Sequence, residues 1–204
     1  MANHATPRPA SKSNSGIEIL PVGPDRLDDL GRLFGTDDIA DRCWCMWFIV
    51  PYKDFHPGGR TGNRLAFIRQ TDEDPHPMGL IAYHRREPAG WCAVGPRARY
   101  TRATKGPTLH TRTGDDVTTW FVPCFFVHHE HRHQGIAAAL LAAAVRHAAV
   151  AGALTIEGFP LAGDTRRSGG SDYMTGNESL FKNAGFEPTT RPSNARVIMR
   201  RTLT

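Results

Sequence analysis

The feature that most constrains the fold of this chain is an apolar segment that runs through a short turn into an alanine-rich segment. Residues 118–127 are mostly aromatic and apolar, which predicts a long buried strand. Residues 135–151 place apolar side chains at helical spacing and predict a helix that packs on a sheet. A strand followed at once by such a helix indicates a layered α/β arrangement.

The turn between these two segments, residues 128–135, is suited to bind an anion. The first amides of a helix have no intrahelical acceptor and lie at the positive end of the helix dipole. Gly135 has no side chain, so a ligand can approach the main chain closely there. The turn therefore predicts a pyrophosphate site built from backbone amides. The alternative is an ordinary strand-turn-helix unit whose glycine serves only the turn.

The remaining segments alternate between strand and helix patterns. Further strands are predicted at residues 17–20, 78–84, 90–94, 153–157 and 195–202. Further helices are predicted at residues 25–34, 37–47 and 61–70 and within 177–186. Connections are predicted at residues 51–59, 97–116 and 159–173, the last rich in glycine. This order predicts a mixed α/β sheet in one domain over residues 17–204.

Composition excludes several classes of protein. The 204 residues contain no run of the roughly 20 apolar residues that span a bilayer, so we expect a soluble, cytoplasmic protein. Residues 1–16 are rich in Pro, Ser, Ala and Asn and predict a disordered tail rather than a secretory signal. The net charge of +5 favours an anionic partner, but the basic residues are scattered, so nucleic acid is not expected.

The motif Arg-x-x-Gly-x-Ala, which begins at Arg132 after the long strand, resembles the acyl-coenzyme A motif of the GCN5-related N-acetyltransferase (GNAT) superfamily. The motif Asn-x-x-x-Phe from Asn177, followed by Gly-Phe at residues 185–186, is similar to the last short helix of such domains. The resemblance spans residues 17–202 and is strongest over 120–186. Four features occur in the order expected for the family: the long strand, the helix that the motif opens, the strand after that helix and the last short helix. This order gives weight to motifs that are individually weak.

The resemblance implies a GNAT-like acyl-CoA-binding fold, in which a mixed, mostly antiparallel central sheet is flanked by helices. It implies an N-acetyltransferase that uses acetyl-CoA as co-substrate and no metal. The acetyl group would pass to a primary amine, on a small molecule or a protein, by direct attack in a ternary complex. The alternative is a non-catalytic acyl-CoA sensor or partner-binding module. The sequence leaves open the identity of the amine and the oligomeric state, a homodimer included.

The resemblance also implies which residues hold the cofactor. Main-chain groups at the end of the long strand would pair with the pantetheine arm, with the N–H of Val127 polarising the thioester carbonyl. That strand would separate from its neighbour, residues 155–157, to admit the cofactor, and the turn and helix start would hold the pyrophosphate. The predicted cofactor-binding residues are Phe125, Phe126, Val127, Arg132, His133, Gln134, Gly135, Ile136, Ala137, Ala138, Asn177 and Phe181.

Two departures from the family pattern concern the catalytic residues. Phe181 stands where many members have the tyrosine that protonates the leaving thiolate, and residues 120–127 lack the carboxylate that many members place there. Glu157, beside the separating strands, is the predicted base for the amine, with a structural cap or ion pair as the alternative. Tyr173 is the predicted general acid, with packing over the pocket as the alternative.

Other chemically notable residues have two interpretations each. The histidines of residues 128–133 suggest a metal site, but they lie in the turn that faces phosphate, and no metal is expected. Trp44, Trp47 and Phe48 are predicted to lie in the core or to line the acceptor pocket. Arg97 is predicted to contact an anionic group of the acceptor or to be solvated.

Overall fold

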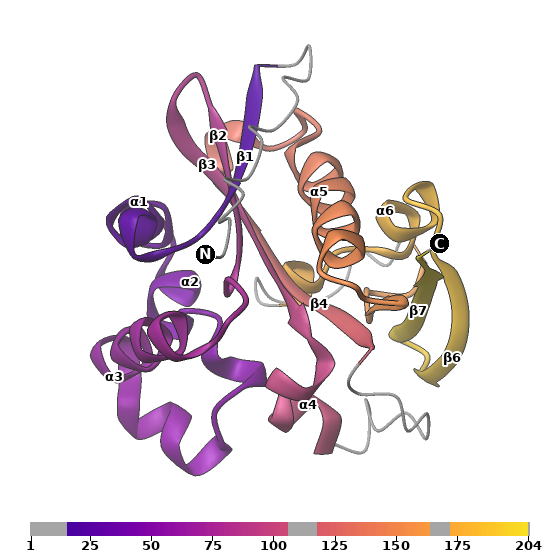
Figure 1. Ribbon diagram of the computed structural model, residues 1–204, viewed down its shortest axis with the longest axis horizontal. Coiled ribbons are helices and arrows are strands. Elements are labelled where there is room, and N and C mark those ends of the chain that lie inside the picture. Colours follow the sequence, from indigo (N-terminus) through magenta and orange to yellow (C-terminus); the bar gives the residue numbers. More distant parts are fainter. Residues whose placement is uncertain (1–15, 106–117, 164–171, 204) are drawn as a thin grey trace, which may run out of the picture.

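The computed structural model describes residues 16–105, 118–163 and 172–203, which form one sheet with helices on both faces (Figure 1). The seven strands lie in the order β1-β2-β3-β4-β5-β7-β6. Neighbouring strands are antiparallel except β4 and β5, which are parallel. The expected mixed, mostly antiparallel sheet is confirmed. The tail predicted at residues 1–16 lies outside the described residues, apart from Gly16.

The strands are β1 (Ile17–Pro21), β2 (Gly79–His84), β3 (Glu87–Pro96), β4 (Thr119–Val127), β5 (Thr155–Gly158), β6 (Glu187–Ser193) and β7 (Arg196–Thr202). The α-helices are α1 (Leu27–Phe34), α2 (Asp38–Cys43), α3 (Tyr52–Glu73), α4 (Thr101–Lys105), α5 (Ile136–Val150) and α6 (Glu178–Asn183). Single 3-10 turns lie at Pro24–Arg26, Met46–Phe48, Arg97–Arg99, His129–His131 and Asp172–Thr175. None of the helices in this part of the chain is long and apolar enough to cross a membrane.

A separate apolar core fills each side of the sheet. On the side of α1, α2 and α3 the core is aromatic, and its largest buried side chains include Phe34, Trp44 and Trp91. On the side of α5 and α6 it is mainly aliphatic and alanine-rich. Helix α5 approaches β3 closely, because a Cβ at Gly90 would lie 2.7 Å from Cγ2 of Ile136. The absence of a side chain at Gly90 permits this close packing.

The prediction of a loop at residues 51–59 is wrong. Helix α3 begins at Tyr52 and continues across a kink at Gly59, where φ is 51° and ψ is −156°. Pro57 and the following glycines, which suggested a loop, instead end one helical stretch and begin the next. Pro57 is the sixth residue of α3, past the first turn, where a proline removes a main-chain hydrogen bond and bends a helix, which agrees with the kink at Gly59.

Strand β6 was not predicted from the sequence. It contains Pro188 and Pro192, and all of its side chains are exposed, so no alternation of apolar and polar residues indicates a strand. Among the described strands it pairs only with β7, at the edge of the sheet. Edge strands tolerate proline because their outer amides need no partner within the sheet.

The prediction of an exposed connection at residues 97–116 is wrong for residues 97–105, the part that the structure describes. Arg97 and Arg99 are 5% and 8% exposed. Nε of Arg99 donates to Oδ2 of Asp74 at 2.9 Å, and Nε of Arg97 lies 3.1 Å from Oε2 of Glu157. Neither interpretation of Arg97, as an acceptor contact or a solvated side chain, agrees with this buried ion pair.

We predict that Gly158→Ala destabilises the fold by about 1–3 kcal/mol, because overpacking a tight contact costs this much. A Cβ at this position would overlap the ring of Phe181, which has no exposed surface. The control is Gly62→Ala in α3, whose Cβ would meet no atom within 4 Å and should be neutral or stabilising. Thermal unfolding of both variants measures the difference. Equal stability of the two variants would contradict the packing described here.

Candidate functional site

Strands β4 and β5 separate halfway along β4. They pair from Thr119 opposite Thr155 to Val122 opposite Gly158, where the pairing ends. Strand β4 continues to Val127 with no neighbour on that edge within the described residues. The separation expected between these two strands is therefore present.

The direction of the main-chain amides explains where the separation begins. The N–H of His128 donates to the carbonyl of Ala89, which directly precedes Gly90 opposite Val127 in β3, at 3.0 Å. Because successive amides of a strand point to opposite edges, those of Phe125 and Val127 point away from β3, toward the open edge. Pro123 occupies the same edge directly after the last pair and has no N–H to donate. A proline at this point prevents the parallel pairing from continuing.

The open edge of β4 faces a cavity of about 650 Å³ between the starts of α5 and α6. Six of the predicted cofactor-binding residues line it: Phe125, Phe126, Val127, Arg132, Ala137 and Asn177. The other lining residues are Asp37, Met174, Gly176 and Leu180. We call this cavity the cofactor cleft, after the role that we propose for it. Residues from β4, α5 and the approach to α6, far apart in the sequence, meet in it.

The start of α5 has unpaired amides beside the cleft. The first main-chain bond of the helix runs from the N–H of Ala139 to the carbonyl of Gly135, at 2.9 Å. Within the described residues, the amides of residues 133–138 donate to no protein acceptor. His133 and Gly135 have positive φ values of 62° and 78°, which turn the chain sharply into the helix. These amides are therefore available to an anion, as the sequence predicts.

Three predicted cofactor-binding side chains have structural contacts instead of open surface. Ile136 is 2% exposed and packs in the α5 core, so only its amide is available to a ligand. Phe181 is fully buried, and its ring lies 6.0 Å from that of Phe125. Oδ1 of Asn177 caps α6 by accepting from the N–H of Leu180 at 2.8 Å. Asn177 thus shapes the cleft by fixing the helix start.

The histidine-rich turn has internal contacts of its own. Nδ1 of His128 accepts from the N–H of Glu130 at 3.3 Å, and the rings of His128 and His129 stack. Burial, followed by the neighbouring His129, lowers the pKa of His128. Nε of Arg132 donates to the carbonyl of Val127 at 3.3 Å, which brings a positive charge to the end of β4. In the part of the chain that the structure describes, no three His, Cys, Asp or Glu side chains are placed to hold a metal ion.

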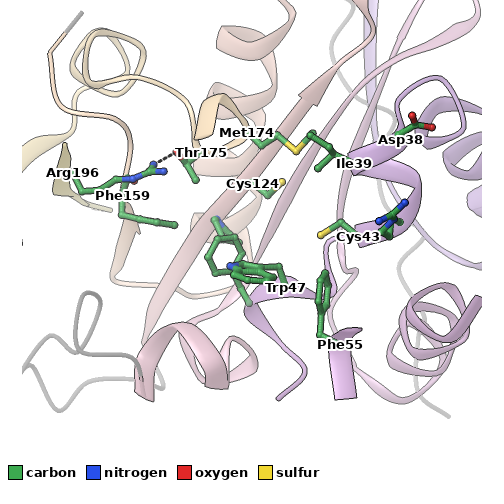
Figure 2. Close-up of a pocket in the computed structure, with 13 residues that line it drawn as sticks. Asp38, Ile39, Cys43, Trp47, Phe55, Cys124, Phe159, Met174, Thr175 and Arg196 are labelled. Atoms are coloured by element: carbon green, nitrogen blue, oxygen red, sulfur yellow. Dashed lines mark hydrogen bonds between the residues drawn. The ribbon is translucent and has the colours of Figure 1, made fainter. Parts of the chain in front are cut away.

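A second cavity, of about 530 Å³, continues along the same edge of β4 (Figure 2). Its aromatic walls are Trp47, Phe48, Phe55 and Phe159. Its other apolar lining is Ile39, Cys43, Pro123, Cys124 and Met174, and its polar lining is Asp38, Arg42, Thr175 and Arg196. Met174 lines both cavities, and Cys124 of this cavity is followed on β4 by Phe125 of the cofactor cleft. The two cavities therefore adjoin. We call the second one the acceptor cavity, after the role that we propose for it.

The chain after α1 is folded so that aromatic residues line the acceptor cavity. Helix α2 is capped by Asp37, whose Oδ1 accepts from the amides of Ile39 and Ala40 at 3.0 and 2.9 Å. It ends at Cys43, earlier than the predicted residues 37–47, because Trp44 and Cys45 have left-handed backbone angles. The turn directs Trp44, which is 2% exposed, into the core.

The two interpretations of the early aromatic residues therefore apply to different residues. Trp44 is a core residue, whereas Trp47 and Phe48 line the acceptor cavity. The sequence did not show which of these residues lies in the core and which line the cavity, because helical spacing across residues 44–48 does not reveal a break in the helix.

The thiols at the acceptor cavity are not set up as nucleophiles. Burial raises the pKa of Cys43 to about 12, so this thiol stays protonated at neutral pH. Cys124 is 6% exposed, and its Sγ lies 3.8 Å from the carbonyl of Phe125. Asp38, the carboxylate of the described lining, points away from Cys124 in Figure 2.

Of the two predicted catalytic residues, Glu157 and Tyr173, the structure describes the side chain of Glu157 alone. Glu157 is 2% exposed and lines neither cavity. Its Oε2 lies 3.1 Å from Nε of Arg97, and its Oε1 accepts from Nε of Arg200 at 2.9 Å. Tyr173 belongs by its backbone to the 3-10 turn Asp172–Thr175, and its side chain lies outside the described part of the structure.

Several lining residues were missed from the sequence, notably Pro123, Met174 and Arg196. A proline within an otherwise apolar strand is the one signal that could have marked the separation point, because proline cannot donate to a neighbouring strand. Met174 and Arg196 carry no local signal. They reach the cavity only because the chain after β5 returns past the open edge of β4.

Comparisons with known proteins agree with this geometry. The sequence model of the acetyltransferase (GNAT) family matches residues 39–159, which include β4 and α5. No curated protein matches the chain. Among solved structures, yncA from Salmonella typhimurium, solved with its cofactor acetyl-CoA, is 14% identical, with a TM-score of 0.56 over 93% of this chain and 95% of that one.

Two further solved structures show the same likeness. The paia N-acetyltransferase from Thermoplasma acidophilum, in complex with coenzyme A, is 14% identical, with a TM-score of 0.52 over 91% of this chain and 98% of that one. An N-acetyltransferase from Staphylococcus aureus is 12% identical, with a TM-score of 0.56 over 92% of this chain and 99% of that one. At these identities the likeness shows a shared fold.

We predict a pH-dependent contribution to stability from Glu178, at the start of α6. Hydrogen bonds from Lys182, from the N–H of Gly163 and from Arg191 lower its pKa from 4.5 to about 2. A lowered folded-state pKa stabilises the fold above the ordinary value, and this contribution is lost as the pH falls toward 2. Glu178→Gln should therefore lower Tm at pH 7, and the difference from the native protein should shrink between pH 4.5 and 2.

The control is Glu187→Gln, which changes an exposed carboxylate on the edge strand. Its Tm should follow that of the native protein at every pH. A Tm difference for Glu178→Gln that grows as the pH falls would contradict the prediction.

Proposed function

Because the chain belongs to the acetyltransferase (GNAT) family, we propose that it transfers the acetyl group of acetyl-CoA to a primary amine by direct attack in a ternary complex, with residues 17–204 acting as one domain. The observation that carries the proposal is the pair of adjoining cavities along the open edge of β4. One cavity ends at helix amides that have no partner in the described residues, and the other is mainly apolar. Such a pair can hold a phosphate-bearing donor and a separate acceptor at once.

In this proposal the cofactor occupies the cleft as a partner for β4. The amides of residues 133–138 hold the pyrophosphate at the start of α5, where the helix dipole also favours negative charge. Of the two outward amides of β4, that of Val127 lies nearer the start of α5 and pairs with the pantetheine arm. The thioester is the end of the arm farther from the pyrophosphate, so we place its carbonyl at the N–H of Phe125, next to the acceptor cavity, rather than at that of Val127 as the sequence suggested. This N–H stabilises the negative charge that develops on the carbonyl oxygen.

The amine enters from the acceptor cavity and attacks the thioester carbon. Its nitrogen lone pair forms the new C–N bond, the C–S bond breaks, and coenzyme A leaves as a thiolate that takes up a proton. The amine nitrogen loses one proton in the same process. Holding amine and thioester in contact supplies several kcal/mol of the rate enhancement, because the reaction within the complex needs no further encounter. The mechanism therefore tolerates Phe181 in place of a tyrosine acid.

The residues that move protons remain predictions. Tyr173 stays the candidate acid. For Glu157, two guanidinium partners and the absence of its carboxylate from both described cavity linings support the structural alternative over the role of base. The amine must then reach the site neutral or lose its proton to water at the cavity mouth.

The sensor hypothesis has weaker support. It rested on Phe181 and on the lack of a carboxylate in β4. A protein that only binds acyl-CoA needs no second cavity beside the thioester position, whereas a transferase does. The acceptor cavity therefore favours catalysis.

We predict that Gly135→Ala weakens acetyl-CoA binding at least about tenfold, a loss of roughly 1.4 kcal/mol. The matched control is Gly152→Ala. Both glycines lie at an end of α5, with φ values of 78° and 85°, and a Cβ at either would meet no atom within 4 Å. Each variant should therefore cost a similar 1–2 kcal/mol or so of stability from the left-handed backbone. Only Gly135 lies beside the proposed pyrophosphate site.

Isothermal titration with acetyl-CoA measures this difference, and thermal unfolding confirms that both variants fold. Equal affinities of the two variants would show that the start of α5 does not hold the cofactor. Folded native protein that binds no acetyl-CoA would overturn the proposed function itself.

We predict that Glu157→Gln lowers stability by about 3 kcal/mol, because it leaves two guanidinium groups without their carboxylate. At a temperature where the variant is folded, kcat should stay within a few-fold of the native value. Arg97→Gln breaks the same ion pair from the other side and is the control. A fall in kcat of about 100-fold or more in Glu157→Gln alone would instead support the role of base.

A further inference from the structure

We propose that the acceptor is a primary monoamine carried on an aromatic body, such as an arylalkylamine. This inference rests on the proposed function and specifies its substrate class. The lining of the acceptor cavity carries it: most of the lining is aromatic or otherwise apolar, and its few charges are mainly positive.

The charges of the cavity disfavour acceptors with several amino groups. The described lining includes one carboxylate, Asp38, and two guanidinium groups, Arg42 and Arg196. A polyamine, an aminoglycoside or a lysine-rich peptide would bring further positive charges toward these arginines, which costs binding energy. Arg196 is held in place against the ring of Phe159, 5.4 Å from its centroid. A monoamine with a neutral or anionic remainder meets no such repulsion.

The aromatic walls are arranged to receive a flat apolar group. The rings of Trp47 and Phe55 meet edge to face at 5.1 Å, and those of Phe48 and Phe159 do so at 5.3 Å. A further ring bound against these walls can make edge-to-face contacts of the same kind. Trp47 is 37% exposed, a large apolar surface that is open to a ligand. A ring bound there would bury it.

A cation outside the cavity fixes the position of Trp47. The guanidinium carbon of Arg102 lies 3.6 Å from the centroid of the Trp47 ring and 5.0 Å from that of Tyr52. A guanidinium over an aromatic face stabilises that ring orientation. Arg102 does not line the cavity, so it is a positioning residue for the aromatic wall.

The cavity also has a direction. In Figure 2 the rings of Trp47 and Phe55 lie at one end, and Cys124 and Met174 lie at the other. Met174 lines the cofactor cleft as well, so this second end is the one next to the thioester. An arylalkylamine with its ring among the aromatic residues would therefore direct its amino group toward the acetyl carbon.

The test is a panel of amines with acetyl-CoA: 2-phenylethylamine and tryptamine against spermidine, kanamycin and a lysine-containing peptide. Thiol release gives the rates, and mass spectrometry identifies the products. We expect kcat/KM for the aromatic monoamines to exceed that for every other class by at least about tenfold, since a pocket discriminates by the apolar contacts it can make. A polyamine, aminoglycoside or peptide as the best acceptor overturns the proposal.

Two outcomes separate this inference from the proposed function. Acetyl-CoA binding in isothermal titration, with no acetylation of either aromatic monoamine, overturns the acceptor class alone. No acetyl-CoA binding by the folded protein overturns the proposed function as well.

A pair of variants locates the contact. Trp47→Ala should raise KM for 2-phenylethylamine about tenfold, with the Kd for acetyl-CoA unchanged, because Trp47 does not line the cofactor cleft. Trp47→Phe should restore most of the affinity. The matched control is Tyr52→Ala, which removes a 63% exposed aromatic residue next to Trp47 that lines neither cavity. An unchanged KM in Trp47→Ala, or an equal rise in Tyr52→Ala, contradicts the proposal.

Discussion

The organisation of this protein depends on the point where β4 loses its neighbour. The parallel pairing with β5 ends at Val122, and the next residue, Pro123, has no amide to continue it. Beyond that point, the outward amides of Phe125 and Val127 lie at an open strand edge inside the molecule. Buried amides without partners are costly, and a ligand that pairs with them removes that cost. The end of the pairing thus leaves this edge of β4 open toward the cofactor cleft, and in the proposed function an extended ligand supplies the missing partners.

An opened sheet needs reinforcement below the opening, and the structure provides it at Glu157. This buried carboxylate lies on β5 and contacts Arg200 of β7 and Arg97, which follows β3. The ion pairs therefore join elements on both sides of β4. On the other face, Phe181 packs against Gly158 at the last paired position. These contacts hold β4 and β5 together over their paired half, next to the half where the two strands separate.

The sequence revealed the cofactor half of the site better than the acceptor half. The long strand, the turn and α5 are contiguous, and their residues interact locally, so pattern and spacing predicted the free amides near Gly135. The acceptor cavity combines residues from α2, the chain after it, β4 and the chain after β5. No local pattern connects these segments. The end of α2 at Cys43, where Trp44 turns into the core beside Phe67, and the buried Arg97 likewise depend on contacts distant in sequence.

By itself, the sequence determined most of the helices and strands and the helix start with its free amides, because hydrophobic periodicity and the free amides of a helix terminus are local properties. Only the tertiary structure decided that Glu157 lies in an ion pair, that Trp47 lines a cavity while Trp44 lies in the core, and that Met174 joins two cavities. Burial and charge pairing depend on which distant segments meet, and that is fixed by how the strands are ordered in the sheet.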